Sequence, residues 1–472
     1  MASDLTMLGG APPSATWRRA RDRLTRRSAH LVVFGPVNAP RRVLRALVGG
    51  RLSAMAEGFD PSFYLAQVPP GLPRRRARRD PLLHYWLIGA RQGRWPSPGF
   101  KAGSPAPPSA AGDGVALLID HGRGGGSSRL LAQYAGKLAQ QGWTVLAPRR
   151  VGRETPLFVF PEGDDWRVFD LIADGTALAD FARARRVSLL VVNHLIDLPQ
   201  DAASLLIRFA DEIGATLEVL LHDYYLACPR IDLIASDGLY CGLAPMETCR
   251  SCLAASGPGL SGVDISVWRS SSASLLAKAA RIVAPSQDLA DRLVAAFPNV
   301  RIDVDEPEDD SALPAISAPP PLALDEAMRV LVLGALNRPK GLDVVIALAR
   351  VLSVRRAPVR ITVLGPAADA RALRGAGVTV LGRYPPEAVH DRLATEAPHV
   401  IFFPAVWPET WSFTLSEALR SDAEILAFDI GAIAKRLKRL GRGRVIPYAA
   451  SSDPHALAAV FLDLREEIAA KG

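Results

Sequence analysis

Two glutamates, Glu409 and Glu417, stand eight positions apart in the segment PETWSFTLSEAL, directly after the apolar run VIFFPAV. We interpret the run as a buried strand, residues 407–410 as the turn after it, and Ser412 as the N-cap of a helix. Glu409 would then lie in the turn and Glu417 inside the helix, where the two carboxylates could contact different parts of one ligand. The alternative is that Glu409 is exposed to solvent and Glu417 lies on the polar face of the helix.

A second group of polar side chains lies in LGALNRPKGLD, where Lys340 and Gly341 follow a predicted strand and directly precede a helix. Arg338 lies two positions earlier. A lysine supplies a point charge and an arginine supplies a planar fork of donors, and a pyrophosphate suits both. The loop therefore predicts a diphosphate site with Lys340 and Arg338 as its basic residues.

A glycine cluster joins a strand to a helix in DHGRGGGSSR. Gly124 and Gly125 would let the backbone approach a phosphate or a sugar at the helix N-terminus; the alternative is a tight turn alone. The dinucleotide fingerprint would need a third glycine at position 127, which is a serine, and no acidic residue ends the next strand. We therefore do not expect a nicotinamide cofactor.

All the cysteines of the chain fall within one segment, HDYYLACPRIDLIASDGLYCGLAPMETCRSC; they are Cys228, Cys241, Cys249 and Cys252. The segment ends in Cys-x-x-Cys, a spacing that tetrahedral zinc favours, so we predict a structural zinc. Free thiols and disulfides are the alternatives, and a cytoplasmic location disfavours disulfides. At the start of the segment, His222 and Asp223 either contact an acceptor or cap the preceding strand.

These residues must be positioned by the apolar strands, which alternate with helical stretches twice along the chain. Continuous apolar strands joined by helices predict parallel sheets that are covered on both faces. The expected fold class is α/β, with two doubly wound Rossmann-like domains facing a cleft and a small helical N-terminal module. In such sheets ligands bind beyond the carboxyl ends of the strands, where the strand order switches.

Composition shifts predict the boundaries of these parts. The expected segments are a basic N-terminal segment (1–58), a short helical module (59–100), a linker (101–114), an acceptor domain (115–310) with a Cys-rich insertion (228–252), a proline-rich linker (311–327) and a donor domain (328–472). Nothing at the sequence level relates the two halves as a repeat.

The glutamate pair, GALNRPKG and GRGGGSSRLLAQYAGKLAQQGWTV together resemble the family 4 retaining glycosyltransferases of the GT-B fold, across residues 113–465. The resemblance implies transfer of a sugar, of hexosyl type and with retention, from a nucleotide-sugar donor to a glycan or lipid-linked acceptor in bacterial surface polysaccharide synthesis. It implies no catalytic metal, and we expect no nucleic-acid partner.

The resemblance also implies roles for individual residues. Glu417 would bind the ribose hydroxyls of the donor. Glu409 would contact the transferred sugar and help to stabilise its developing oxocarbenium charge. Lys340, assisted by Arg338, would neutralise the diphosphate leaving group. His194, after the strand in VVNHLID, would lie near the donor sugar.

The chain departs from the family pattern at two places. Ala335 stands where the family usually has an arginine, and the family's glutamate after a late glycine pair is missing at DIGAIAKR. The Ala335 departure keeps open a non-catalytic GT-B scaffold protein in glycan synthesis. The alternative enzyme is a nucleotide-sugar epimerase or hydrolase of the same fold.

The segment 59–100 resembles a short module that accompanies glycosyltransferases of bacterial surface polysaccharide synthesis. Its aromatic and leucine positions predict two short helices around a turn at VPPGLP. The residues that carry the match are Phe59, Asp60, Tyr64, Pro81, Leu82, His84, Tyr85, Gly89, Gly93, Arg94, Pro96 and Phe100. We expect His84 to be packed in a helix rather than catalytic.

Composition sets the remaining limits. With 472 residues, 49% hydrophobic and 22% charged, the chain is typical of a soluble globular protein of two or three domains. No apolar run reaches the roughly 18 residues of a membrane helix, and no secretory signal is recognisable. We therefore expect a cytoplasmic protein. A peripheral location at the inner membrane is compatible with that expectation.

Positive charge is concentrated at the N-terminal end. Residues 1–112 contain 18 Lys and Arg against 5 Asp and Glu, although the whole chain carries a net charge of only +8. The imbalance predicts that an anionic partner such as a membrane surface meets this part of the chain; the alternative is a solvated arginine-rich surface.

Overall fold

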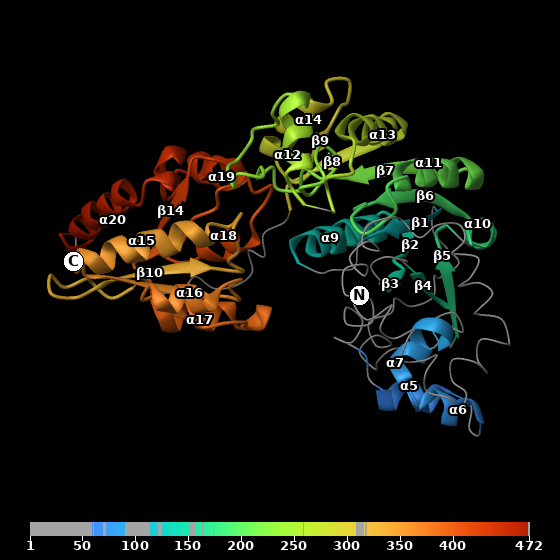
Figure 1. The fold of residues 1–472 in the computed structure, drawn as a ribbon, viewed down its shortest axis with the longest axis horizontal. Coiled ribbons are helices and arrows are strands. Elements are labelled where there is room, and N and C mark those ends of the chain that lie inside the picture. The colour runs from blue at the N-terminus through green and yellow to red at the C-terminus, as the bar shows by residue number, and fades with distance from the viewer. Residues whose placement is uncertain are drawn as a thin grey trace, which may run out of the picture. The chain divides into compact units, whose positions relative to one another are not determined.

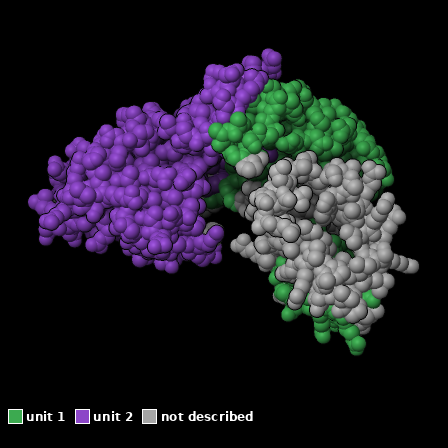
Figure 2. Space-filling view, viewed as in Figure 1, with its two compact units in different colours: residues 1–220, 253–282 green, residues 221–252, 283–472 purple. Residues whose placement is uncertain are grey.

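The computed structural model describes residues 59, 61–68, 72–89, 114–120, 125–151, 157–162, 165–172, 174–257, 259–307, 316 and 319–470. The chain forms two compact units, residues 1–220 with 253–282 and residues 221–252 with 283–472 (Figure 2). The cysteine-containing segment therefore belongs to the same unit as the C-terminal sheet. The predicted domain boundaries stay a prediction, since residues 101–113 and 308–315 lie outside the described residues.

The first sheet has six strands in the order β2-β1-β6-β7-β8-β9 (Figure 1). The strands are β1 (Gly114–Ile119), β2 (Trp143–Leu146), β6 (Val187–Val192), β7 (Thr216–Leu220), β8 (Arg281–Ala284) and β9 (Asp303–Val304). The intervening helices are α9 (Gly126–Gln140), α10 (Gly175–Ala184), α11 (Ala202–Ile213), α12 (Met246–Ala254), α13 (Ile265–Lys278) and α14 (Gln287–Ala296). The pairs β1–β2, β1–β6, β6–β7 and β8–β9 are parallel, as the continuous apolar runs predict.

A small antiparallel sheet, which the sequence analysis did not predict, follows β2. It consists of β3 (Arg149–Val151), β4 (Leu157–Glu162) and β5 (Asp165–Asp170), paired in the order β3-β4-β5. The rings of Phe160 and Phe169 pack edge to face, and both contact the ring of Phe181 of α10 in a tilted arrangement, which anchors the small sheet to the rest of the first unit. The strands are short, and the sequence indicates them only through the alternate aromatic residues Phe158 and Phe160 of β4.

The second sheet has six parallel strands in the order β12-β11-β10-β13-β14-β15. They are β10 (Met328–Leu333), β11 (Val359–Leu364), β12 (Thr379–Val380), β13 (Val400–Phe403), β14 (Glu424–Phe428) and β15 (Arg444–Ile446). Counted from β10 this is the order 3-2-1-4-5-6 of the doubly wound nucleotide-binding fold, and its switch point lies between β10 and β13. The predicted α/β class with two Rossmann-like sheets is confirmed.

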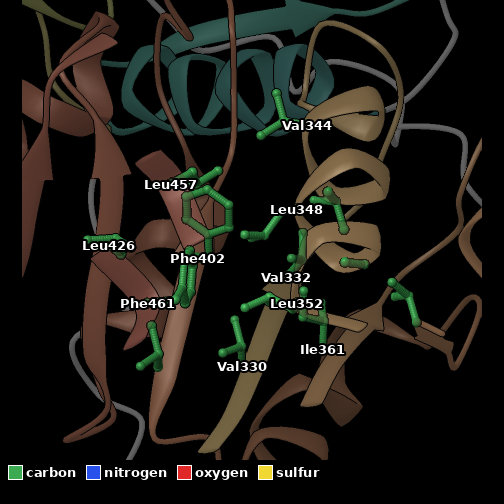
Figure 3. Close-up of a cluster of buried hydrophobic side chains, with 14 of the residues drawn as sticks. Val330, Val332, Val344, Leu348, Leu352, Ile361, Phe402, Leu426, Leu457 and Phe461 are labelled. Atoms are coloured by element: carbon green, nitrogen blue, oxygen red, sulfur yellow. The ribbon is translucent and has the colours of Figure 1, made fainter. Parts of the chain in front are cut away.

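Alternate residues of the central strand β10 enter two different cores, which is why its sequence is apolar throughout. Val330 and Val332 face one core, and Leu331 and Leu333 face the other. Figure 3 shows the first core, which contains Leu348 and Leu352 of α15 (Leu342–Val354), Phe461 of α20 (Pro454–Ala469) and Phe402 of the sheet.

Helices cover both faces of the second sheet. They are α15 (Leu342–Val354), α16 (Ala370–Gly375), α17 (Val389–Glu396), α18 (Phe413–Ala418), α19 (Gly431–Leu440) and α20 (Pro454–Ala469), with 3₁₀ turns at Pro386–Ala388 and Tyr448–Ser452. Side chains of α15, α16 and α20 belong to the first core, and those of α17, α18 and α19 to the second. With both faces filled, only the strand ends are left to bind a ligand.

The described part of the N-terminal module is helical, with three short α-helices where two were predicted. These are α5 (Pro61–Gln67), α6 (Leu72–Ala77) and α7 (Pro81–His84), and α7 continues into a π-helical turn at Tyr85–Gly89. Tyr64 and Tyr85 pack edge to face, and Tyr64 hydrogen-bonds His84 Nδ1. His84 is buried, so it has the packing role that we expected. Of the residues matched to the module, Asp60, Gly93, Arg94, Pro96 and Phe100 lie outside the described residues.

No helix in the described part of the chain combines the length and the apolar character needed to cross a membrane.

Candidate active site at the carboxyl edge of the second sheet

The loop after β10 is a tight turn that presents Lys340. Lys340 N donates to Asn337 Oδ1 at 3.1 Å, and Gly341 N donates to Arg338 O at 2.9 Å. Gly341 has a φ of 86°, and a Cβ at this position would lie 2.1 Å from Pro404 O. Only glycine fits this conformation and this approach, so the turn is seated against the end of β13.

The turn after β13 presents Glu409 and is held by the backbone on both sides. Glu409 N donates to Trp407 O at 2.9 Å, and Glu409 O accepts from Ala432 N of α19 at 2.8 Å. Gly431 has a φ of 71°, and a Cβ there would lie 2.7 Å from Glu409 N. The predicted N-cap is confirmed: Ser412 Oγ accepts from Leu415 N at 3.2 Å and begins α18.

The two turns bring Lys340 and Glu409 together. Lys340 Nζ lies 3.4 Å from both carboxylate oxygens of Glu409. The Glu409 side chain is 8% exposed and the Lys340 side chain 36%, so the alternative of a solvent-exposed Glu409 is wrong. The pair bridges β10 and β13, the two strands on either side of the switch point, which is where an open α/β sheet binds its ligand.

Glu417 lies in α18, in a different environment. Its Oε2 lies 3.4 Å from Arg420 Nη1, and both side chains are largely buried. Tyr384, in the loop after β12, is a neighbour: burial raises the pKa of its hydroxyl, and the negative charge of Glu417 raises it further. Glu417 is therefore not on an open polar helix face; it is a carboxylate with one cationic and one aromatic neighbour.

Arg338 is not brought to the Lys340–Glu409 pair. Its side chain is 82% exposed and its Nε lies 3.5 Å from Asp343 Oδ2 at the start of α15. Ala335, at the position of the family arginine, is also exposed. The assistance of Arg338 in binding a diphosphate stays a prediction. The basic residue that this loop places beside the Glu409 carboxylate is Lys340.

His194, Gly124 and Gly125 belong to the first unit. His194 follows β6, is buried, and accepts a hydrogen bond from Ile196 N on Nδ1 at 2.8 Å. Next to it, Asn193 Nδ2 donates to Asp120 Oδ1 at 2.6 Å, which joins the ends of β6 and β1 at the switch point of that sheet. Gly125 is the N-cap of α9 with a φ of 87°, and Gly124 lies outside the described residues.

The four cysteines are free thiols. Burial, with a smaller contribution from the nearby thiols of Cys241, Cys249 and Cys252, raises the pKa of Cys228 to about 11. Cys249 Sγ donates to Ala244 O at 3.3 Å. As they lie, they do not form a ligand set: within the described ranges, no three histidine, cysteine, aspartate or glutamate side chains are arranged to hold a metal ion. The structural zinc therefore stays a prediction.

Metal analysis of the purified protein tests that prediction. If the cysteines draw together around a structural zinc, elemental analysis should find about one zinc per chain, and replacing Cys249 and Cys252 by serine should abolish its retention. The double serine variant keeps both glutamates and Lys340. Binding of a ligand at these residues would therefore show that the variant still folds. Protein isolated without a chelator and without bound zinc would contradict the prediction.

Three residues near the glutamates escaped the sequence analysis. Tyr384 follows a strand of the second sheet, and the rule that ligands bind at the carboxyl edge was the signal that could have indicated it. Arg436 of α19 packs its guanidinium 3.9 Å from the ring centre of Trp411 and donates to Ser412 O at 2.9 Å. Tyr224 donates its hydroxyl to Pro408 O at 3.0 Å, and nothing in the sequence indicates this contact.

No protein-family model matches the sequence, and a comparison with curated proteins finds no match. Among solved structures, the chain is similar to HepE (Alr3699) of Anabaena in complex with UDP and glucose, at 15% identity and a TM-score of 0.45, over 75% of this chain and 91% of that one. It is also similar to sucrose-phosphate synthase of Thermosynechococcus elongatus, at 15% identity and a TM-score of 0.48, over 75% and 90% of the two chains. Likeness of this degree does not assign an activity to the chain.

Proposed function

We propose that the protein is a glycosyltransferase that uses a nucleotide-sugar as donor. The observation that carries the proposal is the Lys340–Glu409 ion pair at the switch point of the second sheet. Two charged groups of opposite sign, a partly exposed ammonium and a buried carboxylate, meet where this fold binds nucleotides. The family 4 resemblance of the same residues supports the assignment.

The chemistry of sugar transfer needs both signs of charge at one place. Cleavage of the bond between the sugar and the diphosphate leaves negative charge on the phosphate and positive charge on the sugar. An ammonium group stabilises the developing negative charge and a carboxylate stabilises the developing positive charge. Both interactions are stronger where water is excluded. Lys340 would hold the leaving group, and Glu409 would face the sugar.

The finer assignments follow the family resemblance. The proposed acceptor is a glycan or a lipid-linked glycan of the cell surface, the transfer is of hexosyl type, and the configuration is retained. His194 would lie near the donor sugar, and Glu417 would bind the ribose.

Ligand-induced thermal stabilisation followed by turnover tests the proposed function. A nucleoside diphosphate that binds the native state raises the melting temperature, so a screen of UDP, GDP, ADP and TDP identifies the base. Release of that nucleoside diphosphate from its sugar conjugate should then require an added glycan acceptor. Consumption of the donor without an acceptor would instead indicate an epimerase or hydrolase, and binding without turnover would indicate a scaffold protein.

Replacing Glu417 by alanine should weaken donor binding more than it slows turnover. The variant loses the carboxylate that would accept the ribose hydroxyls, and a hydrogen bond to a charged group is worth about a 10-fold to 100-fold change in affinity. We expect KM for the donor to rise by about that factor with a smaller change in kcat. Asp422→Ala, which removes an exposed carboxylate five positions later, is the control. A lower kcat at unchanged donor KM would contradict the ribose-binding role.

The exposed arginines of the N-terminal module suit an anionic membrane surface. Arg75 in α6 and Arg78 and Arg79 after it are exposed and adjacent in sequence. Each basic residue close to an anionic bilayer contributes about 1 kcal/mol, so the triple glutamine variant should co-sediment less with phosphatidylserine vesicles than the parent does. Neutral phosphatidylcholine vesicles are the control, and equal binding to both would contradict the membrane contact.

A further inference from the structure

The cysteine-containing segment 221–252 contacts the glutamate turn directly. Tyr224 Oη donates to Pro408 O at 3.0 Å, and Thr410 Oγ1 donates to His222 O. These two hydrogen bonds hold the residues immediately before and after Glu409. The segment and the turn belong to the same compact unit, although 184 residues separate Tyr224 from Pro408 along the chain.

Tyr224 is fixed in its place by the segment around it. It is fully buried, its N–H donates to Ile231 O at 3.0 Å, and its carbonyl accepts from Cys228 N at 2.8 Å. Its ring lies edge-on to Trp407 with the ring centres 6.3 Å apart. Because burial raises the pKa of its hydroxyl well above the usual value, the group remains a proton donor at physiological pH.

A second contact of the segment supports the chain just before the turn. The ring of Tyr240 lies edge-on to that of Tyr448, with the centres 6.3 Å apart. Tyr448 Oη in turn donates to Val406 O at 2.9 Å. The segment thus contacts, directly or through Tyr448, three alternate residues in and just before the turn: Val406, Pro408 and Thr410.

We propose that the cysteine-containing segment is a positioning element for Glu409, and that Tyr224 is its positioning residue. The inference rests on the proposed function, in which Glu409 faces the transferred sugar. The peptide that leads into Glu409 is held at both of its polar groups, because the Pro408 carbonyl accepts from Tyr224 Oη and the Glu409 N–H donates to Trp407 O. A displacement of about 1 Å at a reacting group can cost about 100-fold in rate.

The kinetic test is Tyr224→Phe, which removes the hydroxyl and keeps the ring. We expect kcat to fall by about 10-fold or more while KM for the donor stays within about 2-fold. In a Glu409→Gln background the same substitution should have little further effect, since its effect passes through the Glu409 carboxylate. Tyr134→Phe, which removes a buried hydroxyl bonded to Glu218 in the first unit, should leave kcat unchanged. An unchanged kcat in Tyr224→Phe, or an undiminished loss in the Glu409→Gln background, would overturn the proposal.

Thr410 provides a second variant pair in case Tyr224→Phe does not fold. Thr410→Ser keeps the hydroxyl that binds His222 O, and Thr410→Val keeps the shape and loses the hydroxyl. We expect serine to retain most of the turnover and valine to lose about as much as Tyr224→Phe. Equal turnover in the two variants would contradict the positioning role of the segment.

Hydrogen exchange separates this inference from the proposed function, because it needs no substrate. The amide of Ala432 is bonded to Glu409 O, and the amide of Glu409 to Trp407 O. If Tyr224 positions the turn, both amides should exchange faster in Tyr224→Phe by about 10-fold, whereas the amides of β14 should not change. Unchanged exchange at 409 and 432 would overturn the positioning role even if the enzyme transfers sugar, and faster exchange would support it even if no donor is found.

Discussion

Replacing Lys340 by methionine is expected to lower kcat by about 100-fold to 1000-fold, the usual consequence of removing a group that stabilises charge in a transition state. Methionine keeps the unbranched side chain and loses the ammonium group. Without it, the diphosphate leaves with no cation opposite its developing charge, and Glu409 loses the partner 3.4 Å away. The measurement is the rate of nucleoside diphosphate release at saturating donor and acceptor.

Lys438→Met is the matched control for this prediction. Lys438 also belongs to the second unit and forms an ion pair, with its Nζ 2.7 Å from Asp429 Oδ1. In this pair, however, the side chains of both residues are about half exposed. The control removes the same charge from the surface and should leave kcat unchanged. Comparable kcat values in Lys340→Met and in the parent would contradict the role of Lys340 in stabilising the leaving group.

Replacing Glu409 by glutamine should lower kcat by about 100-fold or more without weakening the binding of the nucleoside diphosphate. The amide has the size of the carboxylate and lacks its charge, so the loss measures the electrostatic stabilisation of a positive sugar. Because the Glu409 side chain is only 8% exposed, solvent cannot supply this charge in its place. Single-turnover rates with the sugar donor, together with binding of the nucleotide alone, check the two halves of the prediction.

Glu424→Gln is the control for the carboxylate. Glu424 is a partly buried glutamate whose Oε1 lies 3.4 Å from Arg444 Nε, but it begins β14 and so lies at the amino edge of the same sheet. It should retain full turnover. If Glu409→Gln binds the nucleotide much more weakly than the parent at an unchanged kcat, Glu409 belongs to the nucleotide site instead, and the proposed mechanism is wrong.

The architecture and the meeting of Lys340 with Glu409 could be predicted from the sequence for one physical reason. Parallel strands buried on both faces are apolar without interruption, as in β10 and β13, and are recognisable without knowledge of their partners. Once two such strands are recognised, the residues that follow them must lie at one edge of the sheet. Ser412 as an N-cap is equally local, because its side chain bonds an N–H only three residues away.

The features that escaped prediction depend on contacts between distant parts of the chain. Tyr224 reaches Pro408 across 184 residues, and no spacing rule relates the two positions. Arg420 as the partner of Glu417 is local, but helical spacing does not indicate whether a pair will be buried. The exposure of Arg338 could not be predicted either, since the choice between Lys340 and Arg338 depends on how the turn of Gly341 is seated against Pro404.

In the structure, the ammonium of Lys340 and the carboxylate of Glu409 are each other's counter-ions. A sugar donor would replace this pair, because its phosphates would pair with the ammonium and hydroxyls of its sugar would donate to the carboxylate. A spent nucleotide offers a partner to the lysine only and leaves a sheltered glutamate alone, which is electrostatically costly. If the proposed function holds, the Lys340–Glu409 pair would favour the sugar donor over the nucleoside diphosphate product and would help that product to dissociate.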